Sequence, residues 1–456
     1  MSSAFLLRLC AFGIIVTATS NIILMLWQQH RHKDQYSQSS LSEPLVTKTA
    51  NAGSTLGRRA RTEATQKMPS LSIEMPQQQT QRQQQQYVQS PRLEKMLDQD
   101  LQNPNMYFSA CLLIRDDNAL LNEWIAYHYH TLKLRYLVIA TDPNSATSPS
   151  SILQRWENLT DLSVTQWSDH DFMPDTFLKK GYLIPLDRIN GNATQSKWHR
   201  GYEDEEQVKR DLQNINTHRY RQLTFLSSCY RYLYKKKKTW VLHIDTDEYL
   251  TVNPVLRTRG MLGQLAVPKD LREPMALFRF LLAIRHRPRL KHQFNYPCIS
   301  LPRLMFGSVS TDTLGLVKDT YQAAKFETLR WKYHTSFTDR ERNALPKVIV
   351  DVSMVDETDE MFKRKAFSIH RPSKKLCRFV DQIDFGKVES FPLTVNHYLG
   401  SWEHYISRND TRRSKFFYDA KAAVQEGRDD WVSSWIDGFL DEMEPQIARE
   451  LLQDYL

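Results

Sequence analysis

The sequence predicts an α/β fold in which a mostly parallel sheet is flanked by helices. Short apolar strand segments alternate with amphipathic helical segments over residues 110–244, and this alternation favours a parallel sheet with right-handed crossovers. The segment 240–244 is mostly apolar, which is typical of a strand that helices cover on both faces. The aromatic content of 11% with only 14 glycines indicates a large, well-packed globular body.

The first half of this body yields a regular series of elements. Strands are expected at residues 110–114, 136–140, 162–166 and 240–244, and helices at residues 92–101, 119–132, 150–157 and 219–234. Residues 169–216 are polar and weakly periodic, so a long loop is expected there. Beyond residue 250 the pattern is irregular. Short strands are expected at residues 276–280 and 347–352, and a helical tail at residues 431–451.

The amino terminus carries an apolar run long enough to cross a bilayer as a helix, at residues 9–27. A cleaved signal peptide is the alternative, because Ala18-Thr19-Ser20 resembles a cleavage site. The run continues past that point to Leu26, which favours a retained signal-anchor. The chain is therefore divided into a cytoplasmic tail at 1–8, a transmembrane anchor at 9–27, a disordered Gln/Ser-rich stem at 28–105 and a folded body at 106–456.

Sequons, cysteines and charge describe the environment of that body. Sequons at Asn158, Asn192 and Asn409 favour a lumenal location. The cysteines outside the anchor show no Cys-x-x-Cys spacing, which argues against structural zinc and permits one or two disulfides of undetermined pairing, or buried thiols. The formal charge is +9. The tract at residues 235–238 is expected to be a solvated helix end rather than a site for nucleic acid.

Acidic residues follow the strand at 240–244 directly. Asp245 and Asp247 stand one residue apart where an open α/β sheet presents its ligands. One carboxylate can bind a hard cation while the other meets the ligand or a cation-bound water. Such an incomplete oxygen shell suits Mg²⁺ or Mn²⁺ that substrate phosphates also hold. The alternative is a chance Asp-x-Asp in a solvated turn or a helix cap.

Four sequence blocks follow one another along the chain, at residues 113–128, 136–145, 221–249 and 395–403. They include Glu-Trp-Ile-Ala-Tyr-His at 123–128, Asp-Thr-Asp-Glu at 245–248 and Asn-His-Tyr-Leu-Gly-Ser-Trp at 396–402. Together these blocks resemble glycosyltransferase family 92 and its neighbours among the family 2-like transferases. The resemblance covers nearly the whole folded body. It implies a GT-A fold of the Rossmann type, a nucleotide-sugar donor, most simply a UDP-sugar, and Mn²⁺.

The same resemblance assigns roles to three carboxylates. It places Asp142 beside the uridine, because this residue ends the second strand. It brings Asp245 to the ribose or the metal, and makes Asp247 a metal ligand. Two carboxylates and a diphosphate leave room for a further ligand. His397 is the first candidate, and His370 is the second.

Other candidates follow from position alone. Arg115 comes directly after the first strand, where a cation meets a nucleotide. Its alternative role is a salt bridge to Asp116 or Glu123. Glu123 lies on an otherwise apolar helix face, so it either joins the nucleotide site or orients Arg115. If the reaction inverts configuration, a carboxylate must deprotonate the acceptor. Asp312 and Glu327 are weak candidates, and neither is singled out.

The sequence thus predicts an enzyme, a metal-dependent glycosyltransferase of the hexosyltransferase class. It would be a single-pass type II protein of the Golgi membrane with its catalytic domain in the lumen, acting on a glycan or glycoconjugate. A non-catalytic glycan-binding or scaffold protein on the same fold stays open, since fold does not establish activity. A metal-dependent phosphoesterase is a weaker alternative, because two-metal sites need more ligands than this sequence offers.

Overall fold

The computed structural model describes residues 91–180, 205–262, 265–286, 296–307, 315–339, 342–343, 345–356, 362–364, 367–372, 376–377, 391–407, 415–422 and 426–456. The expected tail, the expected anchor and most of the expected stem lie outside this part, as do Asp312, Asn192 and Asn409. Among the described residues, no helix has both the length and the apolar composition needed to cross a bilayer.

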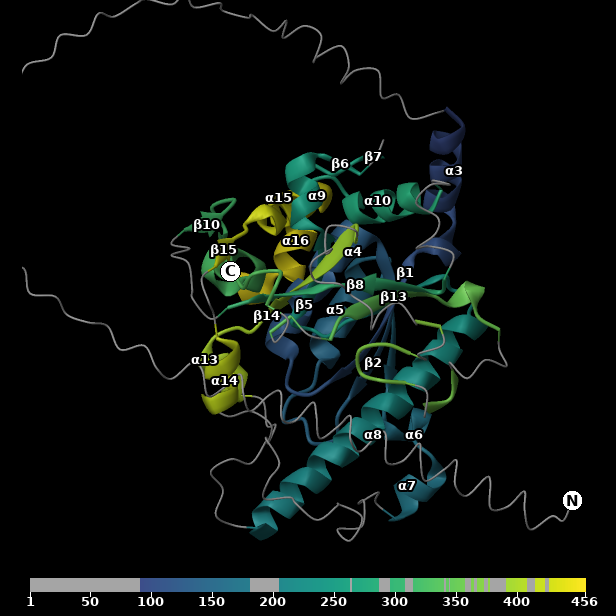
Figure 1. The fold of residues 1–456 in the computed structure, drawn as a ribbon, viewed down its shortest axis with the longest axis vertical. Coiled ribbons are helices and arrows are strands. Elements are labelled where there is room, and N and C mark those ends of the chain that lie inside the picture. Colours follow the sequence, from purple (N-terminus) through teal and green to yellow (C-terminus); the bar gives the residue numbers. More distant parts are fainter. Residues whose placement is uncertain are drawn as a thin grey trace, which may run out of the picture. The chain divides into compact units, whose positions relative to one another are not determined.

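A six-stranded sheet forms the centre of the described body (Figure 1). Its spatial order is β3 (Ser163–Trp167), β2 (Leu134–Thr141), β1 (Phe108–Ile114), β4 (Trp240–His243), β13 (Lys347–Asp351) and β8 (Cys298–Leu301). β1, β2, β3 and β4 pair in parallel, whereas β13 runs antiparallel to both β4 and β8. The predicted α/β class with a mostly parallel sheet is therefore confirmed, with one reversed strand. The strand order changes direction between β1 and β4.

A second sheet has the order β15 (Gly427–Arg428), β12 (Tyr333–His334), β9 (Arg303–Phe306), β14 (Leu393–Tyr398) and β5 (Glu248–Val252). β5 follows β4 almost directly, so the segment between them links the two sheets. β14 pairs antiparallel with β5, and the register sets His397 opposite Glu248. This pairing joins residues that are far apart in the sequence.

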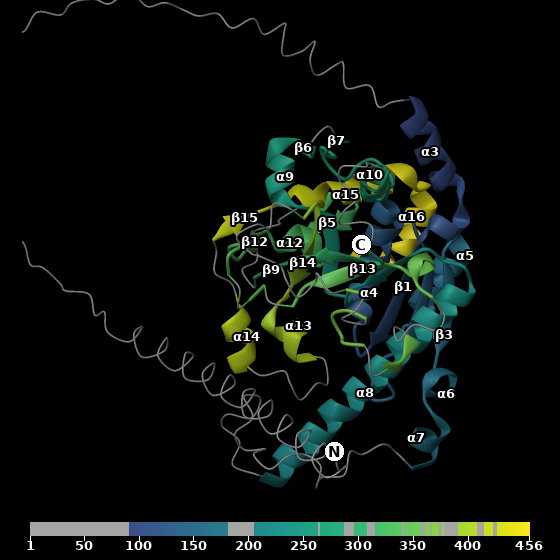
Figure 2. The ribbon, with the colours of Figure 1, turned by 45° about the vertical axis from the view of Figure 1, so that its right-hand side comes forward.

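Helices cover both faces of the six-stranded sheet (Figures 1 and 2). The main ones are α3 (Pro91–Gln102), α4 (Asn118–Leu132), α5 (Ser150–Leu159), α8 (Glu205–Lys235), α10 (Ala276–Arg285), α15 (Trp435–Glu442) and α16 (Pro445–Leu451). Alternate side chains of β1 enter two different cores. Ala110 and Leu112 pack in the core that contains α4, whereas Cys111 packs in the core that contains α8. This period of two explains why the strand is apolar throughout.

The remaining elements are short. They are η1 (Pro104–Met106), α6 (Asp169–Phe172), α7 (Asp175–Lys180), α9 (Pro254–Arg259), β6 (Met261–Leu262), β7 (Leu265–Ala266), β10 (Leu316–Val317), β11 (Tyr321–Gln322), η4 (Ala323–Lys325), α12 (Glu327–Arg330), η5 (Val352–Met354), α13 (Trp402–Ser407), α14 (Lys415–Lys421), η10 (Trp431–Ser434) and η11 (Gln453–Tyr455).

Three sequence predictions are wrong in part. Residues 276–280 begin the helix α10 rather than form a strand, because a short apolar run fits the start of a buried helix as well as it fits a strand. The expected loop 169–216 contains α6, α7 and the first part of α8, whose half-exposed residues give a weak helical pattern. The carboxyl end of the expected stem belongs to the body, since α3 buries Leu97 in the main core.

Two disulfides resolve the open question of the cysteines. Cys111 of β1 pairs with Cys229 of α8, across a sequence separation of 118. Cys298 of β8 pairs with Cys377. The first joins the sheet to the helix that covers it. The lysine tract is a solvated helix end only in part. α8 ends at Lys235 and the next two lysines are exposed, whereas Lys238 is buried with its Nζ over the Tyr136 ring.

His128 of α4 gives the fold a dependence on pH. Its Nδ1 donates to the Trp124 carbonyl at 2.8 Å, and its Nε2 faces the Leu250 amide at 3.5 Å, so the ring is held neutral. Burial lowers the pKa of His128 to about 3. Its stabilising contribution is thus complete above the ordinary histidine pKa of about 6.5 and is lost as the pH falls toward 3. Between pH 7 and pH 5 this loss amounts to about 2 kcal/mol.

His128→Gln should therefore lose about 2 kcal/mol less stability than the wild type between pH 7 and pH 5. Urea unfolding of both proteins at the two pH values measures this difference. His170→Gln changes an exposed histidine and is the matched control, which should keep the wild-type response. Equal pH responses in all three proteins would show that His128 does not titrate between the folded and unfolded states.

Candidate functional site

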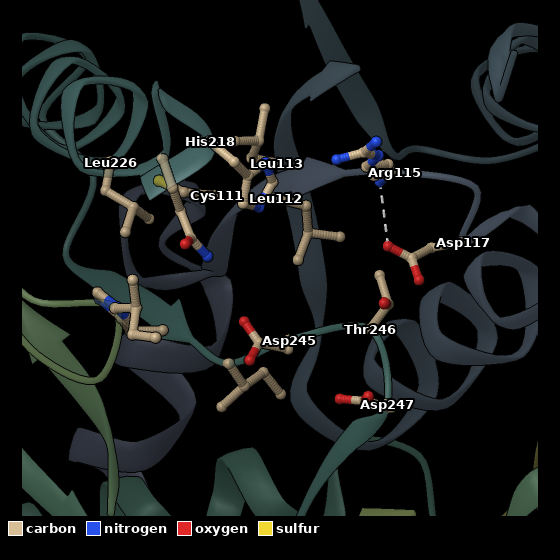
Figure 3. A pocket seen from close by; sticks show the side chains of 14 residues that line it. Cys111, Leu112, Leu113, Arg115, Asp117, His218, Leu226, Asp245, Thr246 and Asp247 are labelled. Atoms are coloured by element: carbon tan, nitrogen blue, oxygen red, sulfur yellow. Dashed lines mark hydrogen bonds between the residues drawn. The ribbon is translucent and has the colours of Figure 1, made fainter. Parts of the chain in front are cut away.

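A pocket opens where the strand order of the six-stranded sheet reverses, between the carboxyl ends of β1 and β4. Open α/β sheets bind ligands in a crevice at this position. The walls come from β1 and the residues after it, from one face of α8, and from β4 and the residues after it (Figure 3). The polar side chains that line it include Arg115, His218, Gln222, Asp245 and Asp247. The lining of the pocket is therefore suited to a charged or polar ligand.

The segment from Asp245 to Glu248 forms a tight turn between β4 and β5. The Glu248 amide donates to the Asp245 carbonyl at 3.1 Å, and the Asp245 amide donates to Glu248 Oε2 at 2.9 Å. The Tyr398 amide of β14 donates to the Asp247 carbonyl at 2.9 Å. Backbone bonds thus fix this turn from both sheets. Asp245 and Asp247 both line the pocket (Figure 3).

Lys347 lies beneath this turn as a fully buried cation. Its Nζ is 2.7 Å from Asp245 Oδ2 and 3.2 Å from Glu248 Oε2. Burial alone lowers the pKa of Lys347, but the two carboxylates outweigh it and raise the pKa. The ammonium therefore stays charged and neutralises part of the acidic turn. Because β13 is the reversed strand, its first residue reaches the carboxyl end of β4.

Asp247, Glu248 and His397 form a cluster whose ligand atoms lie within 4.8 Å of one another. His397 Nε2 is 3.7 Å from Asp247 Oδ2, and His397 Nδ1 is 3.6 Å from Glu248 Oε1. Glu248 Oε1 and His397 Nδ1 are buried and make no hydrogen bond with any described residue. Buried polar atoms without a hydrogen-bond partner require an explanation, and a bound ion is one that these atoms allow. Two carboxylates and an imidazole suit Mn²⁺, so these residues fit a divalent cation.

The membership of the cluster differs from the expected ligand set. Asp247 and His397 were both expected, and the structure brings them together. Asp245 is absent from the cluster, since its Oδ2 meets Lys347, and Glu248 stands in its place. His370 is also outside the cluster. Burial, assisted by the charge of Lys347, lowers the pKa of His370 to about 3, so its imidazole is neutral.

Arg115 is positioned to meet an anion in the pocket. The alternative ion pairs with Asp116 and Glu123 do not form among the described residues. Asp116 accepts hydrogen bonds from the loop at residues 145–147 instead. The Arg115 Nε is buried and has no hydrogen-bond partner in the described part of the chain. Its guanidinium therefore has donors to offer a ligand.

Glu123 has a structural task away from the pocket. Its carboxylate accepts from the Glu327 amide at 2.7 Å and from the Thr328 amide at 3.0 Å, so it caps the short helix α12. Burial raises the pKa of Glu123 to about 8. Glu327 Oε2 accepts from Trp331 Nε1 at 2.7 Å and lies beside Gly400, three residues after His397. Glu327 is thus near the loop after β14, whereas its rival Asp312 lies outside the described residues.

Asp142 is engaged within the protein rather than exposed to the pocket. Its Oδ1 accepts from the Asn144 amide at 2.9 Å, and its Oδ2 lies 2.8 Å from His218 Nδ1 and 3.2 Å from Arg221. Burial opposes ionisation, but the hydrogen bond from His218 and the other partners lower the pKa of Asp142 well below its usual range. Its partner His218 lines the pocket instead (Figure 3).

Sequence reasoning did not assign Glu248, Lys347, His218 or Gln222 to the site. A charged residue that opens an otherwise apolar strand was a readable signal for Lys347. Glu248 was readable as the third acid of its turn. His218 gave no signal, because it lies between the expected loop at residues 169–216 and the expected helix at residues 219–234. The sequence predicts the acidic turn and its position at the carboxyl edge of the sheet, but it does not predict the residues that contact this turn.

Comparison with known proteins adds little to this geometry. The chain matches no protein-family model and no curated protein. A solved structure, S. aureus TarS 1-349, is similar at 10% sequence identity, with a TM-score of 0.22 over 74% of this chain and 72% of that one. A TM-score this low does not establish a common fold. The function is therefore inferred from the site itself.

Proposed function

We propose that this protein is a metal-dependent glycosyltransferase that moves a sugar from a nucleotide-sugar, most simply a UDP-sugar, to a glycan or glycoconjugate. The observation that carries the proposal is the pocket at the reversal of strand order, bordered by Asp247 beside Glu248 and His397. Such a crevice suits a nucleotide. A carboxylate–imidazole cluster at its rim suits a cation shared with phosphates.

The side chains of the site fall into groups suited to the metal ion, the phosphates and the ribose of the proposed donor. A bound Mn²⁺ or Mg²⁺ would neutralise the charge that develops on the diphosphate leaving group. Asp247, Glu248 and His397 would hold that ion, since their ligand atoms lie within 4.8 Å of one another. Arg115 would donate to the phosphates from the end of β1. Lys347 keeps Asp245 ionised, which leaves this half-exposed carboxylate able to accept from a ribose hydroxyl.

Fewer candidate residues can be assigned to the binding and deprotonation of the acceptor. Glu327 is a carboxylate that lies beside the loop after β14, next to Gly400. If the reaction inverts configuration, Glu327 would be the general base, and Asp312 stays the other candidate. We further propose, on the sequence alone, that residues 9–27 anchor the protein in the Golgi membrane with residues 106–456 in the lumen.

The direct test is a donor screen. The full-length chain, purified in detergent, is incubated with a panel of UDP-, GDP- and CMP-linked sugars, with Mn²⁺, with Mg²⁺ or with EDTA. Release of nucleotide from a single donor, lost in EDTA, is the expected result. A folded protein that binds no nucleoside diphosphate would be a glycan-binding or scaffold protein instead. Cleavage of a phosphodiester without sugar transfer would identify a phosphoesterase.

A further inference from the structure

One face of α8 forms a wall of the pocket and carries two polar side chains. His218, Gln222 and Leu226 line the pocket at intervals of four residues, so they lie on one face of that helix. Leu113 and Cys111 of β1 face the same space. The disulfide between Cys111 and Cys229 fixes the helix to the strand at this point. This end of the pocket is therefore a rigid, largely apolar slot with two polar side chains in it.

The imidazole of His218 is held in one orientation. Its Nδ1 lies 2.8 Å from Asp142 Oδ2, and Arg221 also contacts this oxygen at 3.2 Å. Because Asp142 is an ionised carboxylate, it can only accept, so the proton of a neutral His218 resides on Nδ1. Nε2 of the neutral ring is then an acceptor. The Asp142 contact thus decides what His218 can offer a ligand.

Both polar groups retain hydrogen-bonding capacity. Neither His218 Nε2 nor the Gln222 amide is hydrogen-bonded to a residue in the described part of the chain, where Asp142 is the partner of His218. Gln222 is partly buried, and the exposed fraction of the His218 side chain is 14%. Polar groups lining a pocket in this state provide its specificity for ligands. The slot offers one fixed acceptor and one adaptable amide.

We propose that His218 and Gln222 read the edge of the donor's nucleobase and select uracil. Uracil presents an N3–H donor beside a carbonyl acceptor. His218 Nε2 accepts the N3–H while Asp142 holds the ring proton at Nδ1, and the Gln222 amide donates to the neighbouring carbonyl. Cytosine presents an acceptor at N3, which would oppose the lone pair of His218 Nε2. A site with a fixed acceptor rejects such a mismatch, because buried polar groups are left unpaired.

This inference rests on the proposed function, since it concerns the nucleotide half of the same donor. It assigns base recognition to the helix α8 and makes Asp142 a positioning residue behind His218. Asp142 acts through His218 and needs no contact with the base. Guanine has the same donor and carbonyl pair as uracil, but it carries an amino group on the other side of the donor and has a second ring.

Equilibrium binding of UDP, CDP and GDP to the full-length chain at pH 8 in Mn²⁺ tests the assignment. The wild type should bind UDP more tightly than CDP or GDP. His218→Phe keeps a ring without the acceptor and should weaken UDP binding about 10- to 100-fold. The UDP/CDP affinity ratio should fall toward one. Gln222→Ala should weaken UDP binding independently, which covers the case in which His218→Phe does not fold.

Two further variants separate recognition from structure. Asp142→Asn keeps His218 but removes the charge that fixes its tautomer, so the UDP/CDP ratio should fall while near-ultraviolet circular dichroism remains native. Arg219→Ala alters an exposed residue of the same helix and should bind as the wild type does. Tight UDP binding with unchanged ratios in His218→Phe and Gln222→Ala would overturn the inference alone. Preference for GDP would overturn the choice of uracil, and no nucleotide binding by the wild type would defeat the proposed function as well.

Discussion

Asp247→Asn is expected to abolish sugar transfer, with kcat reduced about 10³-fold or more. Asp247 is the half-buried acid of the turn whose Oδ2 approaches His397 Nε2 at 3.7 Å. Asparagine keeps the size of the side chain but brings no negative charge to a cation. The backbone bond from Tyr398 to residue 247 does not involve the side chain, so the turn itself should persist.

Two measurements together check this expectation. Nucleotide release from the active donor reports kcat, and the electron paramagnetic resonance signal of free Mn²⁺ reports cation binding without any turnover. Asp98→Asn makes the same chemical change at an exposed site on α3 and should behave as the wild type. Full transfer by Asp247→Asn would remove Asp247 from the metal site, and unaltered Mn²⁺ binding would place the cation elsewhere.

Lys347→Met is expected to lower the free energy of unfolding by about 3–5 kcal/mol. Lys347 is fully buried between Asp245 and Glu248, at 2.7 Å and 3.2 Å from their carboxylates. Methionine fills similar space but leaves the carboxylates without a counter-charge. Removing one partner of a buried ion pair lowers stability more than replacing the whole pair with apolar residues does. The reason is that the remaining charge is left buried without a counter-charge.

Urea unfolding of Lys347→Met against the wild type measures this loss. Lys318→Met is the matched control, since Lys318 pairs with Asp441 at the surface and exposed pairs contribute little. Its stability should be unchanged within error. Adding Glu248→Gln to Lys347→Met should restore part of the loss, because it removes one stranded charge. A wild-type unfolding curve for Lys347→Met would show that the buried Lys347 and Glu248 do not form an ionised pair.

Local patterns sufficed for the first half of the sheet. The strands β1, β2 and β4 are short apolar runs, and α4 carries its large apolar side chains at helical spacing although it is buried on all sides, so their positions could be predicted within a few residues. The same reasoning placed Asp245 and Asp247 at the carboxyl end of β4. Each of these features depends on neighbours in the sequence, where side-chain period and propensity carry information.

Long-range pairing accounts for what could not be predicted. His397 meets Glu248 because β14 lies beside β5 in one particular register, and no local pattern specifies that register. Lys347 reaches Asp245 because β13 runs against its neighbours. The resemblance pointed to His397 as a metal ligand, but it did not predict that Glu248 rather than Asp245 lies in the metal-ligand cluster. Asp245 is outside the cluster because it pairs with the buried Lys347, and that contact depends on how the strands of the sheet are paired.

The disulfide between Cys111 and Cys229 restricts how ligands enter and leave. It joins the strand that floors the pocket to the helix that walls it, across a sequence separation of 118. The wall cannot swing away from the floor at this point unless the covalent bond breaks. The proposed donor therefore cannot be admitted, nor its product released, by a movement of α8 away from β1 at Cys111, and exchange has to take place with this wall closed.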